Sequence, residues 1–158
     1  MNKQLTIDDA KQSLNVHLAA KGIEVHQKYG RVGWPQLLRL LQDRTCVRYP
    51  CEIEFDAGPL LPGEFGHPIA RGQTPEEGFT IYIHPIYATQ LESVPLLALY
   101  QLVLVNYGDF VSADDAETFG SQALGLSKEE YYRAVCDLAD QLHESFPTTP
   151  DFCSVSAK

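Results

Sequence analysis

The sequence predicts an α+β fold, in which helices flank a small β-sheet and the C-terminal half is predominantly helical. Two segments between residues 46 and 84 resemble strands, and three serine-capped helical segments follow them. The chain has 158 residues, 44% of them hydrophobic, which is enough for one buried core. We therefore expect a single α+β domain over residues 1–145 and a flexible tail over residues 146–158.

The N-terminal third is predicted to be helical. Thr6 and Asp9 have the spacing of a capping box, so the first helix should begin at Thr6, and Gly22 is a natural residue to end it. Residues 23–29 fit either a strand or a continuation of that helix. A second helix is expected after Gly33, with Pro35 in its first turn and its leucines buried.

Two strands are predicted in the middle of the chain, over residues 46–55 and 79–84. In the first, apolar Cys51, Ile53 and Phe55 alternate with two glutamates. Nine glycines and prolines lie between the two segments, so residues 56–78 are interpreted as one long loop. Loops of more than ~15 residues without secondary structure are often functional in compact domains.

Three helices are predicted to close the domain, each opened by a serine. Their expected ranges are 93–106, 112–125 and 127–145, and the last two begin with a capping box. The first of them is the most apolar segment of the chain. A membrane span needs roughly 20 apolar residues, which this segment does not reach, so no membrane partner is expected.

Charge is distributed unevenly along the chain. Acidic residues number 21 and basic residues 12, giving a formal charge of −9 and a pI near 4.9. Residues 1–50 carry eight basic and four acidic side chains, whereas residues 51–108 carry one and seven, and residues 109–158 three and ten. Direct nucleic-acid binding is not expected from an acidic chain. The charge either steers a basic partner protein or serves solubility.

The four cysteines include no CxxC pair, which argues against a zinc ribbon and a thioredoxin-type motif. The N-terminal residues contain no apolar segment of the signal-peptide type, so a cytoplasmic location with reduced thiols is expected. Cys46 and Cys51 could pair in an oxidising compartment, but buried free thiols are favoured.

No local motif predicts catalytic residues, a cofactor or a metal ion. The chain has no histidine pair at i, i+4 spacing, no GxSxG, no P-loop and no GxGxxG. A dispersed metal site remains an alternative. In it, His67 from the long loop, His84 from the end of a strand and Glu117 from a helix converge beside Glu64, as a hydrolase would require.

The order of elements resembles small zincin-type metallopeptidase domains over residues 47–124. A strand ending in IYIHP is followed by an apolar helix and then by DDAETFG. In that family the apolar helix carries HExxH and a downstream helix supplies an acidic third ligand. Here Tyr100 replaces the first ligand histidine, Gln101 the catalytic glutamate and Leu104 the second histidine, whereas Glu117 matches the third ligand.

The resemblance therefore implies a zincin-like pseudoenzyme without metal, because zinc proteolysis needs two imidazoles and a carboxylate that accepts the proton of water. The hypothesis we favour is a non-catalytic interaction or regulatory module for a protein partner, and a basic partner fits the charge. Its recognition surface would be the loop over residues 56–78, beside His84 and the start of the helix expected over residues 93–106. The alternatives are the dispersed-site hydrolase and an acidic inhibitor of a nucleic-acid-binding protein. No oligomeric state follows from the sequence.

Overall fold

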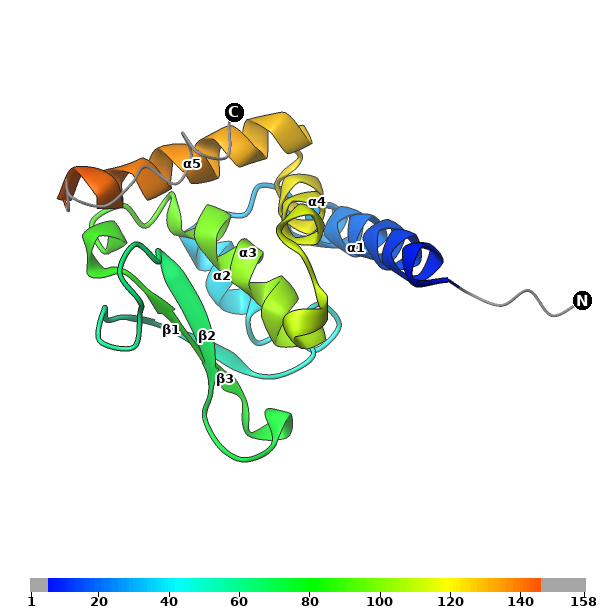
Figure 1. Ribbon diagram of the computed structural model, residues 1–158, viewed down its shortest axis with the longest axis horizontal. Coiled ribbons are helices and arrows are strands. Elements are labelled where there is room, and N and C mark those ends of the chain that lie inside the picture. The colour runs from blue at the N-terminus through cyan, green and yellow to red at the C-terminus, as the bar shows by residue number, and fades with distance from the viewer. Residues whose placement is uncertain (1–5, 146–158) are drawn as a thin grey trace, which may run out of the picture.

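The structure, a computed structural model that describes residues 6–145, has the predicted α+β class (Figure 1). Its α-helices are α1 (Ile7–Tyr29), α2 (Trp34–Leu40), α3 (Val94–Tyr107), α4 (Ala113–Leu124) and α5 (Lys128–Ser145), and its strands are β1 (Cys51–Phe55), β2 (Gly66–Ala70) and β3 (Phe79–Ile83). Among the described residues, no helix combines the length and apolarity that a membrane span requires. The tail predicted over residues 146–158 lies outside the described residues.

The three strands form one sheet in the order β1-β3-β2, with β1 parallel and β2 antiparallel to β3. The predicted alternation in β1 is confirmed: Cys51 is buried, and Glu52 and Glu54 are exposed. Cys51 lies opposite Phe79, and Ile53 lies opposite the fully buried Ile81. The apolar residues of both strands therefore face the same core.

The prediction of one long loop over residues 56–78 was wrong, because it contains the edge strand β2. Glycine and proline at its first and third positions make this segment look like a loop. Pro68 is tolerated because an edge strand leaves backbone N–H groups without a ladder partner. Gly66 is needed because a Cβ there would lie 2.9 Å from the Tyr82 carbonyl oxygen. His67 is consequently a strand residue.

Helix α1 does not end at Gly22 as predicted but continues to Tyr29, so the helical alternative for residues 23–29 is confirmed. A Cβ on Gly22 would lie 2.6 Å from Gln122 Cβ and 2.7 Å from the Phe119 carbonyl oxygen. Gly22 therefore allows α1 and α4 to pack closely. The helix ends instead at Gly30, whose φ of 64° is costly for other residues.

Strand β1 begins five residues later than expected, because a turn around Asp43 occupies the start of the predicted range. Asp43 Oδ1 accepts a hydrogen bond from Thr45 N at 3.0 Å, and the Asp43 carbonyl accepts one from Val47 N at 2.8 Å. The predicted capping boxes at Thr6 and Ser112 are present, but the side chain of Ser93 makes no capping hydrogen bond to α3.

Helix α3 lies between the sheet and helices α4 and α5, and most of its residues are buried. Two tyrosines hold α5 and the segment after β3 against this core. Tyr131 donates to the Leu96 carbonyl at 2.6 Å, and Tyr87 donates to the Leu138 carbonyl at 2.5 Å. This packing places side chains of α3, α4 and α5 around a common hollow.

Candidate functional site

Helices α3, α4 and α5 and the residue before β2 surround a hollow of about 320 Å³, which we call the aromatic–acidic pocket. Three aromatic side chains, Phe65, Tyr100 and Tyr132, line it together with the carboxylate of Glu117. Its remaining lining residues are Ala113, Val135 and Cys136. The walls thus combine π-systems with one acidic group.

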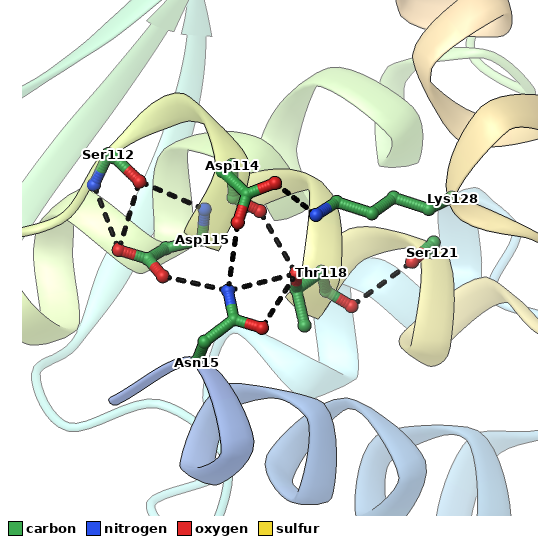
Figure 2. Close-up of polar contacts among 7 residues, drawn as sticks. All are labelled: Asn15, Ser112, Asp114, Asp115, Thr118, Ser121 and Lys128. Atoms are coloured by element: carbon green, nitrogen blue, oxygen red, sulfur yellow. Dashed lines mark hydrogen bonds and ion pairs between the residues drawn. The ribbon is translucent and has the colours of Figure 1, made fainter. Parts of the chain in front are cut away.

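A polar network fixes the helix that carries Glu117, and Figure 2 shows its members. Asn15 of α1 donates from Nδ2 to Asp115 Oδ1 at 2.9 Å and to Thr118 Oγ1 at 3.1 Å. Asp115 in turn accepts from the Ser112 backbone N–H at 3.0 Å, which caps α4. Lys128 forms an ion pair with Asp114 and so ties α5 to the same turn. Glu117 is therefore presented from a helix anchored on two sides.

The carboxyl of Glu117 is in an environment that disfavours its charge. Burial raises its pKa, the negative charge of Asp114 raises it further, and Lys128 acts in the opposite direction. Within residues 6–145 Glu117 has neither a hydrogen bond nor an ion pair, although Lys128 lies near enough to influence it. A cation inside the pocket would stabilise the ionised form.

Tyr100 lines the same pocket as this carboxylate. Burial, together with Glu117 and Tyr132, raises the pKa of Tyr100 to about 12, so its phenol stays neutral at pH 7. The rings of Phe65 and Tyr100 meet edge to face, with centroids 5.7 Å apart and an interplanar angle of 79°. Aromatic faces carry partial negative charge and attract cations. The aromatic rings and the carboxylate thus both favour a positively charged ligand.

The structure brings together two of the residues singled out from the sequence, Tyr100 and Glu117, in this pocket. Gln101 is buried beside Gly66, and its Oε1 has no hydrogen-bond partner in the described part of the chain. Leu104 lines a different pocket, together with His67. The four positions compared with the zincin motif are therefore divided between two hollows and the core.

His67, His84 and Glu117 do not share a site. His67 lies 3.8 Å from Glu64, whereas His84 Nδ1 accepts a hydrogen bond from Ile86 N at 3.2 Å, as expected for a residue that ends a strand. Among residues 6–145, no three His, Cys, Asp or Glu side chains are grouped so that they could hold a metal ion. These side chains therefore form no three-ligand metal group within the described part of the chain.

Sequence reasoning missed two residues of the aromatic–acidic pocket. Phe65 lies in the segment that was predicted to be a loop, and nothing in the sequence singled out Tyr132. No local sequence pattern connects either residue with Glu117, because the three residues belong to different parts of the fold. Cys46 and Cys51, whose pairing was open, are both free thiols.

Comparison of this chain with protein-family models, with curated proteins and with solved structures finds no match. The chemistry of its own residues is therefore the basis of the function proposed below.

Proposed function

We propose that this protein is a non-catalytic interaction module whose aromatic–acidic pocket receives the ammonium group of a lysine side chain on a basic partner protein. The observation that carries the proposal is the half-buried carboxylate of Glu117, without a cationic partner in the described chain, among three aromatic rings. An ammonium ion would neutralise the carboxylate and also gain cation–π attraction, worth about 0.5–2 kcal/mol per contact.

The zincin-like fold is part of this proposal. Support comes from Tyr100 on α3 and Glu117 on α4, which line one pocket, as the first and third ligand positions would in that family. A tyrosine in place of an imidazole changes what the pocket can hold. It supplies a neutral ring for a cation, whereas a metal ion prefers nitrogen, sulfur or ionised oxygen ligands.

A set of amino-acid amides with a common backbone tests the proposal by titration calorimetry and NMR. Nα-acetyl-lysine amide and its Nε-trimethyl derivative carry the cation, and the Nε-acetyl derivative is neutral. We expect both cations to bind and the neutral compound to bind at least tenfold more weakly. Glu117→Gln should weaken the cations about tenfold, which corresponds to ~1.4 kcal/mol.

Glu76→Gln is the matched control. Glu76 is exposed on the short turn before β3, so this substitution removes the same charge at a position outside the pocket. It should leave cation binding unchanged. Tyr100→Phe keeps the ring and should retain most of the affinity, whereas Tyr100→Leu should not. Equal affinity for neutral and cationic compounds, equal effects of the two glutamine variants, or no binding of any cation would each overturn the proposal.

The same titration has a predicted pH dependence. Only the ionised carboxylate attracts the ammonium group, and the pKa of Glu117 is raised from its ordinary 4.5. Binding should therefore be lost, as pH falls, at a pH above the 4.5 that is ordinary for a glutamate carboxyl. Asp114 and Lys128 act on the pKa of Glu117 in opposite directions, Asp114 raising it and Lys128 lowering it.

A further inference from the structure

A second hollow of about 280 Å³ lies between α1, the segment after α2 and the C-terminal end of α3. We call it the basic pocket, because Lys21, Arg44 and Arg48 line it in a protein of net charge −9. It is independent of the aromatic–acidic pocket and shares no lining residue with it. Its other lining residues are His17, Leu18, Thr45, Cys46, Val103, Asn106, Tyr107 and Phe119.

The two arginines of this pocket make no ion pair with any acidic side chain that the structure describes. Among the side chains that the structure describes, Arg44 donates to the Arg48 carbonyl at 3.5 Å, Arg48 donates to the Asn106 carbonyl at 3.4 Å, and neither arginine forms an ion pair with a carboxylate. Lys21 is paired with Glu24 at 3.2 Å. Two uncompensated guanidinium groups beside one hollow favour an anionic ligand.

Arg48 is held in position before any ligand arrives. Its backbone N–H donates to Asn106 Oδ1 at 2.8 Å, and its guanidinium lies over the ring of Tyr49, 5.7 Å from the centroid. Two further lining residues, His17 and Tyr107, are hydrogen-bonded to each other through Nε2 and Oη at 2.8 Å. Side chains ordered in advance lose less conformational entropy when they bind a ligand.

A neighbouring hollow of about 470 Å³ shares Arg48, Asn106 and Tyr107 with the basic pocket. Its walls are mainly apolar and include Tyr49 and Phe79, whose rings lie 5.8 Å apart at 43°. Arg48 therefore lies at the boundary between the basic pocket and the neighbouring aromatic hollow. That combination matches a ligand with an anionic group at one end and a flat ring at the other.

From this juxtaposition we infer that the protein has a binding site for a small phosphorylated molecule with a planar ring, of the nucleoside monophosphate class. The arginines and Lys21 hold the phosphate, because guanidinium groups match its oxygens in pairs. The ring lies against Tyr49 and Phe79. A small ligand is favoured over a nucleic acid because residues 51–108 and 109–158 are both strongly acidic and would repel an extended polyanion.

The experiment is a titration of the full chain with AMP, adenosine and inorganic phosphate, followed by calorimetry and by NMR shifts of His17 and Tyr107. AMP should bind at least tenfold more tightly than adenosine, and phosphate should bind more weakly than AMP at the same site. Arg44→Ala should weaken AMP five- to tenfold. Arg31→Ala, which removes an exposed arginine outside the pocket, and Glu117→Gln should not.

Three results would overturn this inference: equal affinities for AMP and adenosine, equal losses in Arg44→Ala and Arg31→Ala, or no shift at His17 and Tyr107 at AMP concentrations on the order of 10 mM. Tyr49→Leu separates the two subsites, because it should weaken AMP while leaving phosphate binding intact. If Tyr49→Leu unfolds the chain, the ratio of AMP to phosphate affinity in the native protein decides the same point.

Discussion

Helix α3 contributes to two pockets of opposite character. Tyr100, in its middle, faces the carboxylate of Glu117, whereas Asn106 and Tyr107, at its end, stand beside Arg44 and Arg48. The acidic group is half-buried among rings, but the two arginines are exposed. Partial burial weakens screening by salt, and exposure strengthens it. The net charge of the protein therefore predicts the chemistry of neither pocket. A single carboxylate determines what one pocket attracts, and a pair of arginines determines what the other attracts.

The largest expected effect tests the packing of α4 against α5, the helices that carry Glu117 and Tyr132 of the aromatic–acidic pocket. A Cβ on Gly120 would lie within 2.5 Å of Tyr131 Oη, and Tyr131 is completely buried. Gly120→Ala should lower the free energy of unfolding by about 2–3 kcal/mol through overpacking, as measured by urea denaturation. The exposed Gln122→Ala on the same helix should change it by less than ~0.5 kcal/mol. Similar values for the two variants would show that α4 and α5 pack loosely.

The two pockets can be compared directly by measuring both ligands with each variant and at two salt concentrations. Glu117→Gln should weaken the lysine amides about tenfold, or ~1.4 kcal/mol, and leave AMP unchanged. Arg44→Ala should weaken AMP five- to tenfold, or ~1–1.4 kcal/mol, and leave the lysine amides unchanged. Raising the salt concentration should weaken AMP more than the trimethylated amide, since the arginines are exposed. Parallel losses in both ligands would mean that the pockets are not independent.

A smaller effect is expected at the polar network between α1 and α4. Asn15→Ala removes the hydrogen bonds to Asp115 and Thr118, which should cost about 1–2 kcal/mol of unfolding free energy. Gln12→Ala, at an exposed position of the same helix, is the control. Because α4 carries Glu117, Asn15→Ala should also weaken the lysine amides while AMP binding stays unchanged. No loss of stability would contradict the anchoring role assigned to Asn15.

The smallest expected effect concerns the turn that presents Arg44. Hydrogen bonds from Lys28, Tyr29 and Thr45 hold the pKa of the Asp43 carboxyl well below its ordinary 3.8. Its stabilising contribution is fully present above pH 3.8 and is lost as pH falls toward the lowered value. The difference in urea stability between the native chain and Asp43→Asn should thus be larger at about pH 7 than at about pH 2. A difference independent of pH would exclude this role for Asp43.

Local chemistry made several elements predictable from the sequence. The capping boxes at Thr6 and Ser112, the alternation in β1 and the apolar length of α3 depend only on residues a few positions apart. For that reason the α+β class and the start of each capped helix were predicted correctly. The same reasoning failed at Gly22 and at Gly66, where a glycine serves a contact between elements distant in sequence.

For the candidate site, too, the sequence indicated single residues but not the contacts between distant elements. The sequence singled out Tyr100 and Glu117 individually, and it showed that residues 1–50 are the basic part of the chain. It had no means of placing Phe65 and Tyr132 around the same carboxylate.

For this protein, the amino-acid sequence by itself determined the fold class, the helix starts, the asymmetry of charge and the lack of local catalytic motifs. Only the tertiary structure decided that Gly22 would be a packing residue, that the proline-containing segment would become β2, and that Arg44 and Arg48 would meet the end of α3. The physical reason is the sequence separation over which each kind of interaction acts. Caps and alternation act over one to four residues, whereas a pocket requires side chains from several elements to converge, and that convergence is set by how the helices pack on the sheet.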